Sequence, residues 1–148
     1  MNAMTRKWVW SGAVLAGALG MLVGCQSMGP STEQRAMLSG TEEVPPVTTA
    51  AKGIAVVTIT PERAVRAEVT VSGMIPTASH IHEGAAGANG PVIVPFVKSD
   101  TDTNVFVSQP GAKLTEAQYA SYKAGNLYVN VHSAKNPGGE IRAQLKGN

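Results

Sequence analysis

The 148-residue sequence has few of the residues that commonly stabilise or mark a small protein. It contains one cysteine, so no disulfide can form within the chain. Aromatic residues make up only 5% of the sequence, so a folded core must consist mainly of Val, Ile, Leu and Ala. The formal net charge is +2, without the Lys/Arg cluster that marks a nucleic-acid-binding surface. We therefore expect no nucleic-acid partner.

The first 24 residues have the organisation of a secretory signal peptide. Arg6 and Lys7 provide a positive start, and residues 8–24 are uncharged and rich in small and apolar side chains. The Leu-Val-Gly-Cys motif at 22–25 resembles the bacterial lipobox, in which the cysteine sulfur is acylated and the cysteine becomes the new N-terminus. The resemblance implies that acyl chains on Cys25 attach the protein to a membrane. An uncleaved anchor or an incidental buried cysteine is the alternative.

Removal of the signal peptide would leave equal numbers of acidic and basic side chains. Membrane attachment would then depend on the acyl chains and not on a basic surface. Gln26 follows the cysteine, and the absence of Asp there resembles the Gram-negative pattern for sorting to the outer membrane. We expect a lipoprotein that faces the periplasm. We divide the chain into a signal peptide (1–24), a flexible tether rich in Ser, Gly, Pro and charge (25–36) and a β domain (37–148).

Most of the β domain shows the short, alternating runs of β-strands. Runs bounded by Gly- and Pro-rich turns predict strands at 53–60, 63–72, 78–82, 92–97, 127–132 and 140–146, with weaker alternation around 105–107. Thr115 and Gln118 form a capping-box pattern and Gly125 marks a helix end, so we expect one helix at 116–124. The pattern predicts an all-β fold, an antiparallel Greek-key sandwich or barrel with one short helix.

The sequence contains only three histidines, and they share a pattern. Residues two apart in a strand point to the same side, so His80 and His82 lie opposite Ile81. His132 likewise lies opposite the apolar residues of its own run. Three imidazoles suit a transition-metal site, and copper is the ion that we favour. The alternative is that the histidines hydrogen-bond to loop backbone and stabilise the fold.

Two polar neighbours are candidates for orienting the imidazoles from outside the ligand set. Glu83 directly follows His82, and Asn130 shares the polar side of its run with His132. Glu83 is equally suited to capping a turn. The glycine-rich segment 84–91 is not a phosphate-binding loop, because neither a Lys-Ser/Thr pair nor a helix follows it. Its glycines indicate positive φ angles or close backbone approach.

Three segments together resemble the CHRD domain, which takes its name from chordin and is common in secreted bacterial proteins. They are LSGTEEVPPV (38–47), ASHIHEGAAGANGPVIV (78–94) and AGNLYVNVHSAKNPGGEIRAQL (124–145). The resemblance extends over about residues 37–146. It implies the fold of the domain but no particular enzymatic activity.

A second, weaker similarity is to copper–zinc superoxide dismutases. In that family a His-x-His lies on one strand of a Greek-key barrel, a later strand ends in a histidine, and an arginine near the C-terminus guides superoxide. His80 and His82 match the pair, His132 matches the later ligand, and Arg142 matches the arginine. The chain has no fourth histidine to bridge two metals, so the similarity implies a copper-only site. Arg142 would be catalytic only in a dismutase.

Two classes of function follow from the sequence. In the first, the protein is a lipid-anchored envelope module that binds a protein partner or provides structure without catalysis. We favour this class, because accessory β domains are abundant and a fold does not define a function. In the second, it is a periplasm-facing copper protein for sequestration, delivery or superoxide chemistry. The two classes differ in whether the histidine nitrogens converge to ligand distance.

Replacement of Cys25 by Ser removes the sulfur that would be acylated. We expect Cys25→Ser to leave an unprocessed or soluble protein, whereas the unsubstituted protein fractionates with membranes. Cell fractionation and mass spectrometry of the N-terminal peptide measure both effects. The lipobox interpretation is wrong if the variant is processed normally, stays with the membranes and shows no difference in acyl groups.

Overall fold

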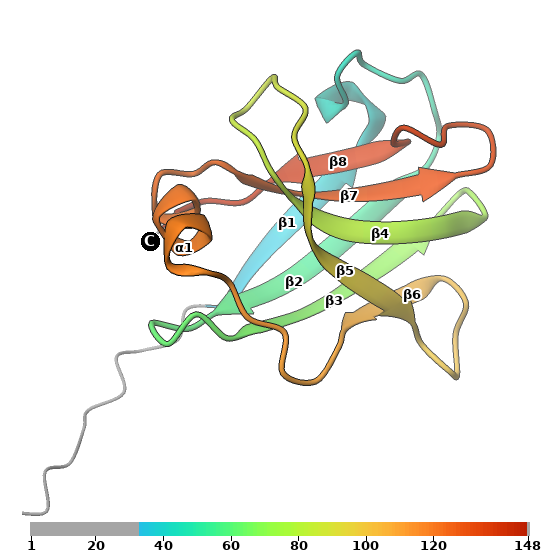
Figure 1. The fold of residues 1–148 in the computed structure, drawn as a ribbon. Helices are drawn as coiled ribbons and strands as arrows, with labels where there is room; N and C mark the ends of the chain where they lie inside the picture. Colours follow the sequence, from blue (N-terminus) through green and yellow to red (C-terminus); the bar gives the residue numbers. More distant parts are fainter. Residues whose placement is uncertain (1–32, 148) are drawn as a thin grey trace, which may run out of the picture.

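The computed structural model describes residues 33–147, so the predicted signal peptide, Cys25 and most of the predicted tether lie outside the described residues. Eight strands form a closed antiparallel barrel with one helix near the end of the chain (Figure 1). The strands are β1 (Glu33–Ser39), β2 (Lys52–Ile59), β3 (Val65–Ser72), β4 (Pro76–Glu83), β5 (Val92–Lys98), β6 (Val105–Ser108), β7 (Leu127–Ser133) and β8 (Ile141–Gln144). A 3-10 turn, η1 (Gly40–Glu42), follows β1, and the helix α1 (Glu116–Lys123) precedes β7.

The strand order around the barrel is β1-β2-β3-β6-β5-β4-β7-β8, and β8 returns to pair with β1. The consecutive strands β4, β5 and β6 lie side by side, with β3 next to β6 and β7 next to β4. Each of these sets of four strands is a Greek key. The predicted all-β, antiparallel Greek-key fold with one short helix is therefore confirmed. Across residues 33–147, no helix combines the length and the apolar character needed to cross a bilayer.

The alternation in each strand determines which side chains fill the barrel. In β2 every second residue is buried, and in β4 the buried Ser79 and Ile81 point inward. The interior consists almost entirely of aliphatic residues with Phe96, Phe106 and Tyr122, as the low aromatic content predicts. Tyr122 extends the core from α1, which begins with the predicted capping box between Thr115 and Gln118.

The strand β1 begins at Glu33, four residues before the predicted start of the domain. Its polar residues 33–35 resemble a tether in composition, but Ala36 and Leu38 alternate into the core. The strand pairs with β2 along its whole length, and the Gln34 side chain donates a hydrogen bond to the Tyr122 hydroxyl at 3.1 Å. Pairing with β2 therefore outweighs local composition, and the folded domain includes at least residues 33–36.

The outer face of β4, β7 and β8 is covered, although its side chains are polar. Tyr128, Asn130 and Arg142 point away from the core and are still 2%, 3% and 1% exposed. The segment 84–91 and the segment 40–50 lie over this face (Figure 1). They are joined by a hydrogen bond from the Asn89 amide nitrogen to the Val44 carbonyl oxygen at 2.8 Å. This covered outer face, distinct from the core, contains the three histidines.

Ile81 lies between His80 and His82 but points into the core and is fully buried. We expect Ile81→Ala to lower the free energy of unfolding by about 2–5 kcal/mol, the usual cost of such a cavity. Ile75, which is 84% exposed, provides the matched control. Ile75→Ala should change stability by no more than about 0.5 kcal/mol. Chemical denaturation measures both values, and equal effects would contradict the assigned orientation of β4.

Candidate metal centre

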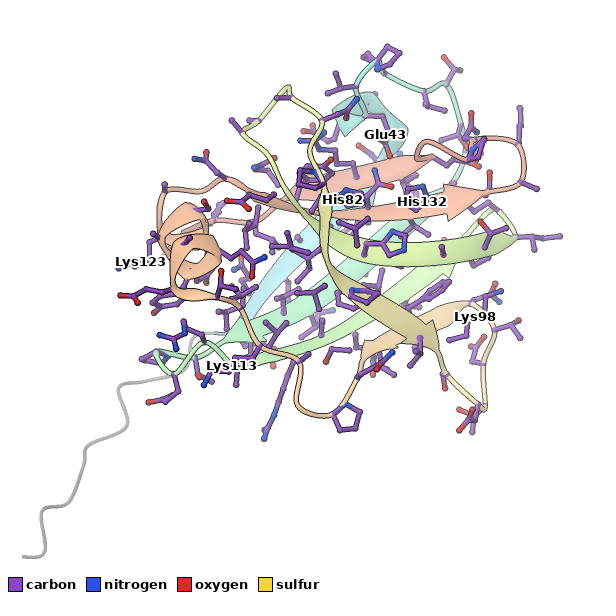
Figure 2. The ribbon with its side chains drawn as sticks, viewed as in Figure 1. Glu43, His82, Lys98, Lys113, Lys123 and His132 are labelled. Carbon is purple, nitrogen blue, oxygen red and sulfur yellow. The ribbon has the colours of Figure 1, made fainter. Side chains whose placement is uncertain are left out.

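The pairing of β4 with β7 brings the three histidines together on the outer face of the barrel. In this pairing Ala78 lies opposite His132, and His80 lies opposite Asn130. His132 is thus diagonal to His80, and His82 is two residues further along β4. One ring nitrogen from each histidine lies within 4.8 Å of the others. Figure 2 shows His82 and His132 next to each other over β7.

Backbone carbonyls determine which ring nitrogens carry protons. His82 Nδ1 is 2.9 Å from the Gly90 carbonyl oxygen, and His132 Nδ1 is 2.9 Å from that of Pro137. Because a carbonyl oxygen only accepts, both Nδ1 atoms are donors, and both Nε2 atoms of the neutral rings keep a lone pair. His132 Nε2 accepts in turn from His80 Nδ1, 3.1 Å away. The Nε2 lone pair of His132 is therefore directed at His80, and that of His82 has no partner among the described residues.

The Nε2 atom of His82 is buried and has no hydrogen-bond partner among the described residues. Such a buried acceptor is unfavourable, since burial removes its bond to water without replacing it. Most buried polar groups in proteins are satisfied. Among the described residues three other buried polar atoms are also unpaired, Thr60 Oγ1, Arg63 Nε and Asn130 Oδ1, and His82 Nε2 is the one that belongs to an imidazole of the cluster.

The surroundings favour the neutral form of two of the imidazoles, those of His80 and His82. Burial, and to a lesser extent the neighbouring imidazoles of His132 and His82, lowers the pKa of His80 to about 4. Burial also lowers the pKa of His82, with smaller contributions in the same direction from His132 and Arg142, against the opposing effect of the hydrogen bond to Gly90. Neutral imidazoles are the form that binds metal ions.

A buried carboxylate lies next to the cluster. Glu43, in the segment after η1, is 5% exposed and accepts a hydrogen bond from the Asn130 amide nitrogen at 2.8 Å. Burial raises the pKa of Glu43 to about 7, although the charge of Arg142 and the bond from Asn130 oppose this shift. Figure 2 shows Glu43 above β7, close to the two labelled histidines. Asn130, predicted to orient an imidazole, thus connects β7 to Glu43.

The other two predicted site residues make contacts that the sequence did not indicate. Glu83 accepts a hydrogen bond from the Ser121 hydroxyl of α1 at 2.5 Å, and within the described chain it has no hydrogen bond to an imidazole. Arg142 lies close enough to the cluster to lower the pKa of His82. Its guanidinium group, however, donates to segment 84–91, with its shortest bond to the Ala88 carbonyl oxygen at 2.9 Å.

The sequence did not predict the role of Tyr128, whose ring packs against the histidine cluster. Its ring stacks on His82, with centroids 4.8 Å apart and an angle of 9° between the planes. The Arg142 guanidinium lies on the Tyr128 ring, 3.4 Å from the centroid. The available signal was the two-residue alternation that places Tyr128, Asn130 and His132 on one side of β7. It shows the shared face but not the stacking partners.

Comparison with known proteins gives one match. The family model described as the CHRD domain matches residues 34–145, which is most of the chain and nearly all of the barrel. No curated protein and no solved structure is similar enough to the chain to count as a match.

The partial burial of His80 predicts its titration in the metal-free protein. We expect the ring C–H resonances of His80 to titrate near pH 4, whereas an unperturbed histidine titrates near about 6.5. The physical reason is the loss of water around the charged form on burial. A pH series of NMR spectra, assigned with the variant His80→Gln, measures the value. A midpoint near that of a free histidine would contradict the described burial of the ring.

The same shift predicts a dependence of stability on pH. Because its pKa is lower in the folded state, the contribution of neutral His80 is complete above about pH 6.5 and is lost as the pH falls toward 4. Glu43 acts oppositely, since its raised pKa gives a contribution that is lost as the pH rises through about 7. We therefore expect Glu43→Gln protein to lose stability on acidification from pH 6.5 to 4. The double variant with His80→Gln should lose less, as measured by denaturation at each pH.

Proposed function

This chain belongs to the CHRD-domain family, and we propose that it is a lipid-anchored binding module of the bacterial cell envelope whose ligand is a transition-metal ion, with copper favoured. Family membership supports a binding or structural module. The geometry of the three histidines supports the metal as ligand, and the sequence around Cys25 supports the anchor.

The observation that carries the proposal is the unpaired Nε2 atom of His82. One ring nitrogen from each of His80, His82 and His132 lies within 4.8 Å of the others, and of the two His82 nitrogens Nδ1 is already bonded to Gly90. A bound metal ion would satisfy this nitrogen, which has no partner among the described residues. The carbonyls of Gly90 and Pro137 hold the other nitrogens of two rings, as the partners of ligating histidines commonly do.

The distances fit a single ion after a small adjustment. Nitrogen–metal bonds are about 2.0–2.1 Å long, so three nitrogens spread evenly around one ion are about 3.3–3.6 Å apart. The three nitrogens lie within 4.8 Å of one another, so the most distant pair must approach by roughly 1–1.5 Å. His80 must also move its proton from Nδ1 to Nε2 before Nδ1 can bind, because Nδ1 now donates to His132. This change of tautomer keeps the ring neutral.

The ligand set favours copper. In the part of the chain that the structure describes, the cluster contains imidazoles without a carboxylate or thiolate. Imidazole suits copper, zinc, iron and nickel, while oxygen ligands suit magnesium and calcium. Among divalent ions of the first transition row, Cu²⁺ binds such sites most tightly.

We propose binding without turnover, in preference to superoxide chemistry. A guiding arginine must present free N–H groups to an incoming anion, but Arg142 is 1% exposed. Its guanidinium nitrogens donate to the carbonyls of Ala85 and Ala88 and to the side chains of Asn89 and Gln144. These contacts favour sequestration or delivery of the ion.

The lipid anchor would place the metal site at the membrane surface. The chain between Cys25 and Glu33 can extend at most about 30 Å, so acylated Cys25 would keep the barrel close to the bilayer. The Gln that follows Cys25 supports the outer membrane as the location.

Copper titration of the mature chain tests the metal site directly. We expect tight binding of one ion per chain and a loss of more than about a hundredfold for His82→Ala, since loss of an outer partner of a ligand alone costs about 10–100-fold. His80→Ala and His132→Ala should have similar effects. Competition with a chelator of known affinity, followed by calorimetry, measures the change.

Arg66→Ala, at an exposed position on β3, is the control and should bind copper as the unsubstituted protein does. Circular dichroism shows that each variant is folded. If the unsubstituted protein binds copper no more tightly than a variant with all three histidines replaced by Ala, the histidines are structural and the proposal is wrong.

A further inference from the structure

We propose that Arg142 and Tyr128 are positioning residues, which fix the ring orientation and tautomer of His82 through the backbone of Gly90. The inference deepens the proposed metal-binding function and rests on it for the purpose of the arrangement. The arrangement itself is a property of the metal-free protein.

Gly90 is the link between His82 and the other two residues. Its carbonyl oxygen accepts the hydrogen bond from His82 Nδ1 at 2.9 Å. This bond keeps the proton on Nδ1 and leaves Nε2 free to bind the ion. A Cβ atom at residue 90 would lie 1.6 Å from the Glu83 carbonyl oxygen, so only glycine can approach β4 this closely. The position of the Gly90 backbone thus controls the chemistry of His82.

Tyr128 holds Gly90 and His82 at the same time. Its hydroxyl accepts a hydrogen bond from the Gly90 N–H at 3.1 Å. Its ring is nearly parallel to the His82 ring, at an angle of 9°. The β4–β7 pairing places His82 directly opposite Tyr128, so this stacking is built into the barrel. Tyr128 therefore determines the plane of the imidazole as well as the position of its hydrogen-bond acceptor.

Arg142 holds the rest of the segment that carries Gly90. Its Nη2 donates to the Ala88 carbonyl at 2.9 Å and to the Ala85 carbonyl at 3.3 Å, and its Nη1 donates to Asn89 Oδ1 at 3.3 Å. Its planar group also covers the Tyr128 ring at 3.4 Å. The Tyr128 ring thus stacks on the His82 ring and on the Arg142 guanidinium group. Hydrogen bonds from Arg142 and Tyr128 hold segment 84–91 beside this stack.

The chemistry of this position requires arginine. A guanidinium group presents several donors in a fixed plane and stacks on an aromatic ring, whereas the lysine ammonium is a compact charge without a plane. Arg142→Lys therefore keeps the charge near the cluster and removes the stacking and the multiple bonds to segment 84–91. It separates the positioning role from a general electrostatic role.

The first measurement is the tautomer of His82 by nitrogen NMR in the metal-free mature protein with labelled histidine. We expect a single tautomer with the proton on Nδ1 in the unsubstituted protein. Arg142→Lys and Tyr128→Phe should both give a mixture of the two neutral tautomers. Tyr128→Phe should have the smaller effect, because phenylalanine keeps the stacking and loses only the two hydrogen bonds to Gly90, one from its N–H and one to its carbonyl oxygen. Arg66→Lys on the outer face of β3 should leave the tautomer unchanged.

The second measurement is copper affinity by chelator competition. We expect Arg142→Lys to weaken binding by about 10–100-fold, the usual effect of losing an outer partner of a ligand. A residue with only a structural role would lower stability but would leave the tautomer and the affinity of the folded protein unchanged.

The proposal is overturned if Arg142→Lys is folded and keeps both the Nδ1 proton and the original affinity. If Arg142→Lys does not fold, Tyr128→Phe decides, and an unchanged His82 tautomer in that variant also overturns the proposal. The tautomer measurement needs no metal. A failure of copper binding in the unsubstituted protein would therefore remove the proposed function without deciding the positioning role.

Discussion

The pairing register between β4 and β7 is the constraint on which both the core and the histidine cluster depend. It places Ile81 opposite Val129 on the inner face and His82 opposite Tyr128 on the outer face. A shift of one residue in either strand would exchange its inner and outer side chains. Imidazoles would then enter the core, and aliphatic side chains would leave it. The cost of that exchange fixes the register, because the inner residues are fully buried. Burial of apolar surface on one side of the sheet thereby sets the geometry of the polar side.

The sequence was sufficient for the elements that follow β1 and for the face on which the histidines lie. Alternation of period two located the strands from β2 onward, and the capping box located α1, because these patterns reflect contacts between residues close in the chain. The convergence of His80 with His132 needed one further condition, the neighbouring position of β4 and β7. The residues alone did not predict that topology.

The contacts that complete the cluster could not be predicted, since they depend on loops that fold back from distant parts of the chain. Glu43 meets Asn130 across 87 residues, and Arg142 meets Ala88 across 54. Neither contact has a periodic signal. The start of β1 was missed for a related reason: its polar residues show their role only when β2 is present as a partner. Local pattern thus predicted the frame of the barrel, while long-range hydrogen bonds determine how its outer face is covered.

The separation of the two faces has a consequence for the history of such domains. Because the sheet shields the aliphatic interior from the outer side chains of β4, β7 and β8, substitutions on one face leave the packing of the other intact. A descendant can therefore exchange its imidazoles for other polar groups and still fold as the same barrel. Selection can therefore change the side chains of the outer face without first changing the core, so that proteins of this architecture can diverge in the polar chemistry of that face.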